Sequence, residues 1–254
     1  MEVAAVRPPA VAGSFYPADA AELAAEVARL LAAAAPGPAP KALIAPHAGY
    51  VYSGPVAASA FRRVQGSPLR RVVLLGPAHY AWLRGVALPA ARSFATPLGE
   101  VAIEEAGLPR DRAAHEREHS LEVEVPFLQV ALPEGFALTP LLVGDADPAG
   151  TARILDALWG GPETLIVVSS DLSHYLAWAA ARRADAATAE RILALQPVEA
   201  EDACGAAPVN GFLAAAARRK LRGELLDLRN SGDTAGDRSR VVGYGAFAFY
   251  EARA

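Results

Sequence analysis

Runs of consecutive apolar residues recur along the chain, and three of them end close to a histidine or an acid. The three runs are residues 41–46, 71–76 and 164–169. Their length, their Val, Leu and Ile content and the Gly, Pro or Ser at their ends predict buried strands of an α/β sheet. His47 and His79 follow the first two runs, and Asp171 with His174 follows the third. Because ligands bind in the crevice beyond the carboxyl ends of parallel strands, we expect these side chains to converge on one edge of the sheet.

Segments with a helical spacing of apolar residues alternate with the strand-like runs. In the first of them Asp19 can cap the helix, Glu22 follows three residues later, and an apolar stripe faces inward. That stripe consists of Leu23, Val27, Leu30 and Leu31. Further helices are expected near residues 54–65, 120–131, 149–159, 175–196 and 208–221. Further strands are expected near residues 85–88, 137–143 and 241–250, the last of them at an edge of the sheet.

This alternation predicts the fold class. It is typical of an α/β protein in which helices cover both faces of a largely parallel or mixed sheet. The proline-rich segment at residues 36–40 is too short for a domain boundary, and the sequence contains no internal repeat. We therefore predict a single domain over residues 1–254, built as a three-layer α/β/α sandwich.

Composition narrows the classes of partner and compartment. A net charge of −4 and an isoelectric point near 5.8 argue against nucleic acid, whose partners carry basic surfaces. No apolar stretch approaches the ~18 residues of a membrane span, although 53% of the residues are hydrophobic. Glu2 stands where a secretory signal would carry positive charge, and the single cysteine, Cys204, excludes an internal disulfide. We expect a soluble cytoplasmic protein that binds neither nucleic acid nor a membrane.

His47 and His79 are the first candidates for chemistry. An isolated histidine is more often a core or surface residue whose hydrogen bonds are satisfied than a ligand. Two histidines at equivalent strand exits favour a site instead, and Gly76 before His79 permits close approach of the backbone.

Asp171 and His174 offer a second pair. The serines and the aspartate of residues 169–175 would also fit the cap of a helix, but a cap does not explain His174 one turn later. A histidine near a carboxylate can transfer protons.

Cys204 has two interpretations. It is either a small buried hydrophobe or a thiolate that a helix beginning near Pro208 would stabilise for ligation.

Residues 115–119 read His-Glu-Arg-Glu-His, which matches the H-E-x-x-H pattern of zinc metalloproteases. The variable positions here are Arg117 and Glu118, whereas a buried catalytic helix favours apolar residues. We therefore interpret His115 as exposed and His119 as a residue that can line the pocket. Phosphate-binding loops and the Gly-x-Ser-x-Gly pattern of serine hydrolases are absent from the sequence.

Several ordered motifs together resemble a known family over nearly the whole chain. The motifs are residues 12–17, 45–50, 76–79, 118–122, 126–128, 142–144, 169–175, 204–205 and 230–233. They resemble the Memo-like family, whose prokaryotic members are called AmmeMemoRadiSam system protein B. The resemblance implies an α/β/α sandwich like that of the class III extradiol ring-cleavage dioxygenases. It also implies a radical-SAM protein and a further small protein as partners.

The resemblance further implies a metal site for iron or copper. Its ligands would be His47, His79 and Cys204, with Asp171 and His174 beside them. Non-haem iron oxygenases typically use two histidines and a carboxylate, whereas a thiolate favours Cu(I) or zinc. The third ligand is therefore open at this point between Cys204 and Asp171, and the dioxygenase activity does not follow from the fold alone.

Three functional hypotheses follow from these residues. The first is a metal-dependent redox protein in which Asp171 orients His174 as the acid–base group, with His119 and Tyr50 lining the pocket. The second is a zinc hydrolase on the same scaffold, since two histidines and a cysteine also suit a catalytic zinc. The third is a non-enzymatic protein that uses the pocket to bind a partner peptide. The first is preferred.

Overall fold

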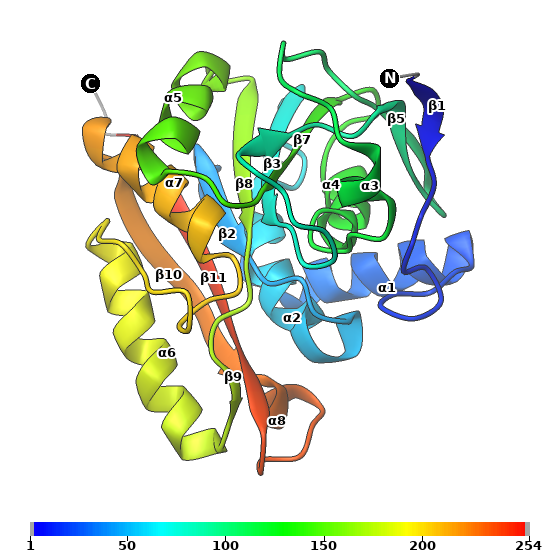
Figure 1. Cartoon of the computed structure of the whole chain (residues 1–254). Coiled ribbons are helices and arrows are strands. Elements are labelled where there is room, and N and C mark those ends of the chain that lie inside the picture. Colours follow the sequence, from blue (N-terminus) through cyan, green and yellow to red (C-terminus); the bar gives the residue numbers. More distant parts are fainter. Residues whose placement is uncertain (1–2, 252–254) are drawn as a thin grey trace.

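A mixed sheet of eight strands forms the centre of the computed structural model, which describes residues 3–251 (Figure 1). The strand order is β10-β11-β2-β8-β3-β7-β4, and β9 pairs with β11. The four strands β2, β8, β3 and β7 are parallel to one another, while β11 and β4 run antiparallel to their neighbours. These strands are β2 (Ala42–Ala45), β3 (Arg71–Pro77), β4 (Val86–Ala87), β7 (Ala137–Val143), β8 (Thr164–Ser169), β9 (His174–Leu176), β10 (Arg222–Asn230) and β11 (Val241–Tyr250).

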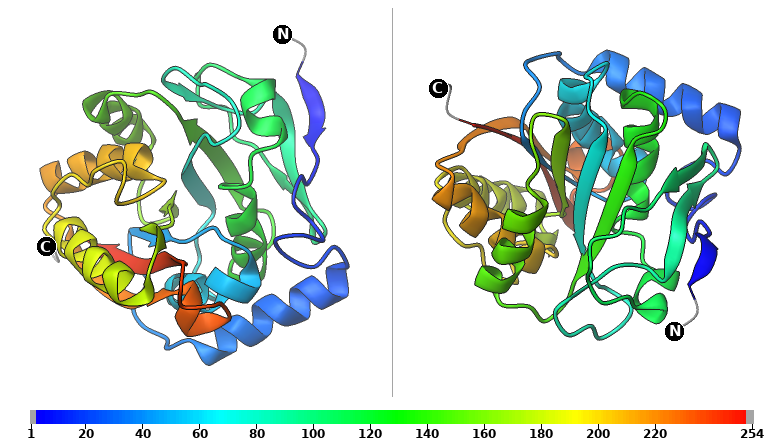
Figure 2. Two further views of the ribbon diagram at one scale, coloured as in Figure 1. Left: turned by 60° about the horizontal axis from the view of Figure 1, so that its bottom comes forward. Right: turned by 90° about the horizontal axis from the view of Figure 1, so that it is seen from above.

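Helices cover both faces of this sheet, as the two further views show (Figure 2). On one face lie α1 (Ala20–Ala33), α2 (Tyr50–Phe61) and α4 (Val125–Ala131), and on the other lie α5 (Pro148–Leu158), α6 (Trp178–Leu193) and α7 (Ala206–Arg218). The remaining short helices are α3 (Arg112–Glu116), α8 (Ser231–Thr234), η1 (Arg62–Val64) and η2 (Glu122–Glu124). Each face of the sheet packs its own apolar cluster. The predicted three-layer α/β/α sandwich is confirmed.

The first helix shows how local sequence determines an element. The Asp19 side chain accepts hydrogen bonds from the backbone N–H groups of Ala21 and Glu22, which satisfies donors that a helix start leaves free. The predicted stripe is buried, and α1 packs against α2 and α4. The stripe is Leu23, Val27, Leu30 and Leu31.

Three expectations about elements are corrected. The last strand, β11, is not at an edge, because β10 pairs outside it over residues 222–230. β10 is an edge strand that is only partly buried, so its charged side chains stay in contact with solvent. The helix expected at 120–131 is a 3₁₀ turn followed by α4, and β9 precedes α6 where one helix was expected over 175–196.

No helix in the described part of the chain is long and apolar enough to cross a bilayer. The longest, α6, has 16 residues, several of them charged. A membrane-spanning helix needs about 20 predominantly apolar residues.

A second, three-stranded sheet fastens the beginning of the chain. It consists of β1 (Ala4–Arg7), β5 (Ala91–Thr96) and β6 (Gly99–Ala102). Arg7, at the end of β1, forms a buried ion pair with Glu122 and donates to the backbone carbonyls of His115 and Glu118. The Glu122 carboxylate also accepts from the hydroxyl of Tyr16, 2.6 Å away. These bonds attach the N-terminal segment to the loop that carries residues 115–124.

Replacing Glu122 with Gln should therefore destabilise the fold strongly. The substitution leaves the Arg7 guanidinium buried without its counter-charge, and such a loss costs about 3–5 kcal/mol. Urea denaturation of the two proteins measures the difference. Glu105→Gln is the matched control and should change stability little, because Glu105 is 76% exposed and its partner Arg110 also donates to two backbone carbonyls. Equal effects of the two substitutions would contradict this role of Glu122.

Candidate metal centre

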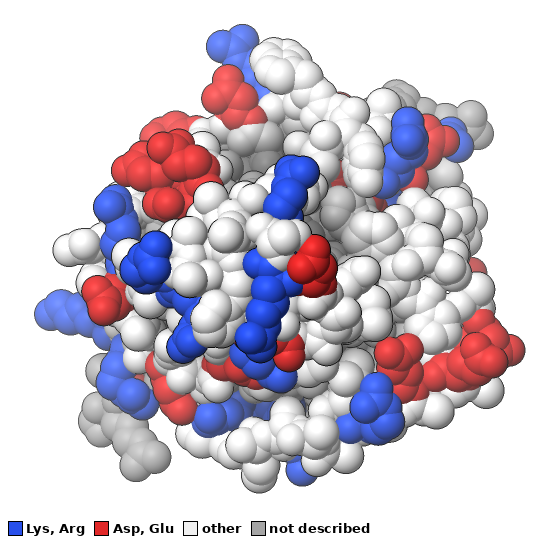
Figure 3. All heavy atoms as spheres, turned by 90° about the horizontal axis from the view of Figure 1, so that it is seen from below, with Lys and Arg blue, Asp and Glu red and all other residues white. Residues whose placement is uncertain are grey.

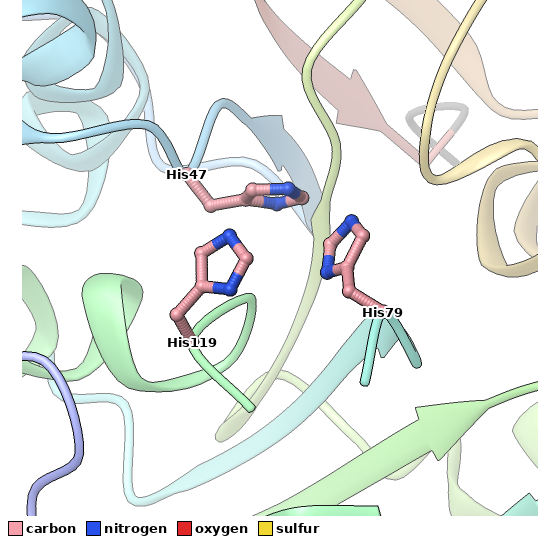
Figure 4. Close-up of side chains that lie close together, drawn as sticks. All are labelled: His47, His79 and His119. Atoms are coloured by element: carbon pink, nitrogen blue, oxygen red, sulfur yellow. The ribbon is translucent and has the colours of Figure 1, made fainter. Parts of the chain in front are cut away.

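Three imidazole rings meet beyond the carboxyl ends of β2 and β3 (Figure 4). One ring nitrogen each of His47, His79 and His119 lies within 4.8 Å of the others. The rings of His79 and His119 are stacked with centroids 4.8 Å apart, and His47 stands edge-on to both. His47 is 2% exposed, whereas the side chain of His79 is 27% exposed. The cluster is therefore closed on the His47 side and open on the His79 side.

Glu118 fixes two of the three histidines. Its carboxylate accepts from His79 Nδ1 at 2.9 Å and from the His79 backbone N–H at 2.5 Å. It also accepts from the backbone N–H groups of His119 and Ser120, both at 2.9 Å. Burial raises the pKa of this carboxyl, but the hydrogen bonds from His79 and Ser120 outweigh it and lower the pKa to about 2. Because an ionised carboxylate only accepts, His79 carries its proton on Nδ1 and presents the lone pair of Nε2.

The close approach of this loop depends on Gly76. A Cβ at this position would lie 2.8 Å from the side chains of both Leu121 and Ser120. The Ser120 hydroxyl donates to the carbonyl of Pro77 at 2.8 Å. The loop after α3 therefore lies directly against the end of β3, which brings His119 beside His79.

Ser169 determines which ring nitrogen of His47 carries the proton. The Ser169 hydroxyl oxygen lies 2.7 Å from His47 Nδ1, 2.6 Å from the carbonyl of Ser120 and 2.8 Å from Glu124 Oε1. A serine hydroxyl donates one hydrogen bond and accepts two. The carbonyl can only accept, so the hydroxyl donates to it and His47 Nδ1 must donate to the hydroxyl. His47 then presents Nε2 to the cluster.

The number of hydrogen bonds that the Ser169 hydroxyl can donate also determines the protonation state of Glu124. With its single hydrogen given to the carbonyl of Ser120, the Ser169 hydroxyl can only accept from Glu124, so Glu124 must be a neutral acid. Glu124 is completely buried, and burial raises the pKa of its carboxyl well above the ordinary value. All three contacts of Ser169 are then satisfied at once.

Cys204 lies next to the cluster. Its sulfur is 3.3 Å from His47 Nε2, the nitrogen that the hydrogen bond to Ser169 leaves free. A Cβ at Gly205 would lie 2.6 Å from the Ser170 side chain, so the glycine allows the chain before α7 to approach β8. Burial raises the pKa of the Cys204 thiol, which favours the protonated thiol in the metal-free protein, and ligation by Cys204 stays a prediction.

Asp171 and His174 have different partners from those expected. Asp171 accepts from the backbone N–H of His47 at 2.8 Å, and burial raises the pKa of its carboxyl to about 7. His174 donates through Nδ1 to the carbonyl of Leu172 at 2.8 Å. The orientation of His174 therefore comes from its own loop, and Asp171 holds the backbone that carries His47.

A cavity of about 420 Å³ opens beside the cluster. Its wall includes His119, Asp171 and His174 from the site and Tyr175 and Arg240 from the outer rim. Tyr50 is not among the lining residues: its ring is buried in the apolar cluster, and its hydroxyl donates to the carbonyl of Val123.

Comparisons with known proteins find relatives over nearly the whole chain. The family model described as Memo-like protein matches residues 7–248. A MEMO1 family protein of Methanopyrus kandleri is 36% identical over 96% of this chain and 98% of its own length. A MEMO1 family protein of Aquifex aeolicus is 35% identical over 94% of this chain and 97% of its own length. One of Archaeoglobus fulgidus is 34% identical over 96% of this chain and 99% of its own length.

The chain belongs to the Memo-like family. The resemblance read from the motifs is thereby confirmed. In this Memo-like chain the sequence motifs around the histidines also contain the residues that hold them, namely Glu118 and Ser169.

The zinc-protease pattern at residues 115–119 does not form a zinc site. α3 ends at Glu116, so His115 and His119 do not share one helical face. His115 is 2% exposed, which corrects the expectation of an exposed residue. Its Nε2 lies 3.0 Å from the carbonyl of Ala87, to which it donates, and Arg7 binds its backbone carbonyl. These contacts explain why a polar ring is buried here.

The sequence alone did not single out the residues that support the cluster. Glu118, Glu122 and Glu124 are all buried, and the last two alternate with buried apolar residues from 121 to 125. Acids next to apolar residues were the sequence feature that could have identified these supporting residues, because a buried carboxylate needs a specific partner.

Glu124→Gln should fold and remain as stable as the wild type. The Gln amide can donate to the Ser169 hydroxyl as the neutral acid does. If Glu124 were ionised, the same change would place two donors against each other and cost about 1–3 kcal/mol. Urea denaturation at neutral pH measures this, with the infrared band of a protonated carboxyl as a second readout. A large loss of stability together with no such band would contradict the assignment.

The His115 ring should make the protein less stable in acid. Burial lowers the pKa of His115 to about 4, from an ordinary value of 6.5. Between these values the unfolded chain binds more protons, so stability falls as the pH falls from 6.5 towards 4, by up to about 3 kcal/mol. His115→Gln should flatten this part of the curve of unfolding free energy against pH. A variant whose curve keeps the wild-type slope would refute this contribution.

Proposed function

We propose that this Memo-like chain is a metal-dependent redox protein that binds iron or copper and acts on a small molecule in the cytoplasm. The observation that supports it most is the convergence of three imidazole nitrogens with a cysteine sulfur 3.3 Å from one of them. In this proposal His47 and His79 are ligands, and His119 and Cys204 complete the donor set.

The separation of one donor pair, His47 Nε2 and the Cys204 sulfur, is compatible with a shared ion. Metal–nitrogen bonds of ~2.0–2.1 Å and a metal–sulfur bond of ~2.3 Å at a tetrahedral angle place nitrogen and sulfur about 3.6 Å apart. The 3.3 Å between His47 Nε2 and the Cys204 sulfur is close to this separation. His119 Nδ1 is buried and has no hydrogen-bond partner among the described residues, although Glu118 lies 3.3 Å away outside hydrogen-bonding geometry. Because His119 Nδ1 faces the Glu118 carboxylate, Nε2 is the ring nitrogen left for a cation.

The protonation states also suit a cation. Burial lowers the pKa of His47 well below its ordinary value and lowers that of His119 to about 4, so both rings are neutral at pH 7. Neutral imidazole is the form that binds a metal, whereas Cys204 must lose its proton to do so. When bound, iron or copper supplies the one-electron chemistry that side chains lack.

In this proposal His174 is the acid–base group. Its Nδ1 donates to the carbonyl of Leu172, so Nε2 has a free lone pair, and the residue lines the cavity. Burial lowers the pKa of His174, which keeps the ring neutral and able to accept a proton from a substrate hydroxyl. Asp171 contributes by holding the His47 backbone. A radical-SAM partner protein stays a prediction from the family resemblance.

A zinc-dependent hydrolase is the second candidate, because three histidines with an open position are also a donor set of catalytic zinc. The open position here would face the cavity beside His119. Zinc gives no electron paramagnetic resonance signal even after oxidation, whereas Fe(III) and Cu(II) do, so spectroscopy of the oxidised protein separates the two candidates.

Metal analysis of protein purified without an affinity tag tests the proposal. We expect the purified protein to contain iron or copper, or to take up about one such ion per chain under anaerobic conditions. His47→Ala and His79→Ala should each lower the metal affinity by more than tenfold. His115→Gln is the control, since His115 is a buried histidine outside the cluster and should leave affinity unchanged. Absence of any transition metal after anaerobic loading would refute the proposal.

A further inference from the structure

The wall of the cavity combines aromatic rings with one guanidinium group. Four aromatic side chains line the cavity. They are Phe15, Tyr52, Tyr175 and Tyr244. Arg240 is the one arginine among the lining residues. A cavity of about 420 Å³ has the size of sites that enclose small molecules.

Arg240 is held by an aromatic ring and not by a carboxylate. Its guanidinium carbon lies 5.0 Å from the centroid of the Tyr175 ring. No acid lies within ion-pair distance of Arg240 among residues 3–251. Stacking on a ring orients the planar group while its N–H donors stay free.

The two acids of the cavity wall are already engaged. Asp171 accepts from the backbone of His47, and Asp237 accepts from the backbone N–H and the hydroxyl of Ser239. Neither of them neutralises Arg240. Asp237 keeps its negative charge on this wall, but it binds Ser239, so the N–H donors of Arg240 are available to a molecule inside the cavity.

Tyr175 occupies a backbone conformation that needs a reason. Its φ is +60°, a left-handed value that non-glycine residues rarely adopt, and the side chain is 63% exposed. An exposed tyrosine gains little from burial, so packing does not account for this conformation. Residues in such conformations cluster at sites that bind ligands. Here the conformation places the ring where it both lines the cavity and supports Arg240.

Further positive charge lies beside this rim. Arg182 and Arg238 each stack on the Trp178 ring, with guanidinium carbons 4.8 Å from its centroid. Figure 3 shows this face of the molecule, on which lysine and arginine side chains gather in a band near its middle. Asp233 belongs to the same group, because its carboxylate accepts from the Trp178 ring N–H at 2.6 Å and so balances part of this positive charge.

We propose that the cavity binds a small organic anion whose oxyanion group, a carboxylate or a phosphoryl group, is held by Arg240 and whose apolar body packs against the aromatic wall. The inference rests on the proposed function in one respect only, since it makes this anion the substrate presented to the metal site. Arg240 and Tyr175 are then specificity determinants of that reaction. A guanidinium binds both oxygens of such a group at once, which gives orientation as well as affinity.

The test uses the metal-free full-length protein, so that no ligand can bind through a metal ion. Isothermal titration calorimetry compares benzoate and phenylphosphonate with benzamide, which is neutral and has nearly the shape of benzoate. We expect at least one anion to bind saturably and at least tenfold more tightly than benzamide. The tighter of the two anions identifies the oxyanion group.

Arg240→Gln should weaken binding of the preferred anion about tenfold, which corresponds to about 1.4 kcal/mol, and leave benzamide unchanged. Arg183→Gln is the matched control, because it removes the same charge from an exposed position nearby that does not line this cavity. Tyr175→Asn, which tolerates the left-handed backbone but lacks the ring, should also weaken anion binding.

Three outcomes would overturn the inference: no saturable binding of either anion, benzamide binding as tightly as the anions, or equal losses in Arg240→Gln and Arg183→Gln. None of these depends on metal uptake. A protein that binds the anion through Arg240 but takes up no metal would refute the proposed function while leaving the anion site intact.

Discussion

The arrangement of the histidines depends on one buried carboxylate. Glu118 accepts four N–H groups, two from His79 and one each from the backbones of His119 and Ser120. Burying an ionised carboxylate is costly unless its oxygens are paired, and these four bonds provide the pairing. The same bonds fix the Nδ1 proton of His79 and place His119 beside it. Stability of the loop and orientation of the rings therefore have one cause.

Glu118 is one of three acids that connect this loop to different parts of the fold. Glu122 holds the N-terminal segment through Arg7, and Glu124 reaches His47 through Ser169. The two strand exits and the loop are thus tied together before any cation is present. A preorganised donor set loses little conformational entropy on binding, which is the usual physical basis of a tight site. Hydrogen-bonded partners of this kind also fix which nitrogen of each ring is free.

Much of the fold followed from the sequence because its signals are local. The apolar runs before His47 and His79 and the cap at Asp19 each depend on a few neighbouring residues, and the structure has strands and a helix at these places. β10 escaped prediction because an edge strand with charged residues does not show a buried pattern. The position of β11 inside the sheet depended on that missing neighbour.

The site was predictable only in part, for a related reason. Strand exits place His47 and His79 together, but the approach of His119 depends on Gly76 and on contacts between residues some 40 positions apart. The partner of His174 is a backbone carbonyl, which no side-chain pattern reveals. Burial of His115 likewise results from tertiary contacts with Arg7 and Ala87.

The central claim is that the rings of His47, His79 and His119 are held in place for a single cation. Crystal structures of the metal-free and metal-loaded protein, with anomalous diffraction at the absorption edge of the metal, test it most directly. The account predicts one anomalous peak within bonding distance of His47 and His79, and ring positions that differ by less than ~1 Å between the two structures, as expected of a preorganised site. A peak elsewhere, or rings that are scattered without the metal, would contradict it.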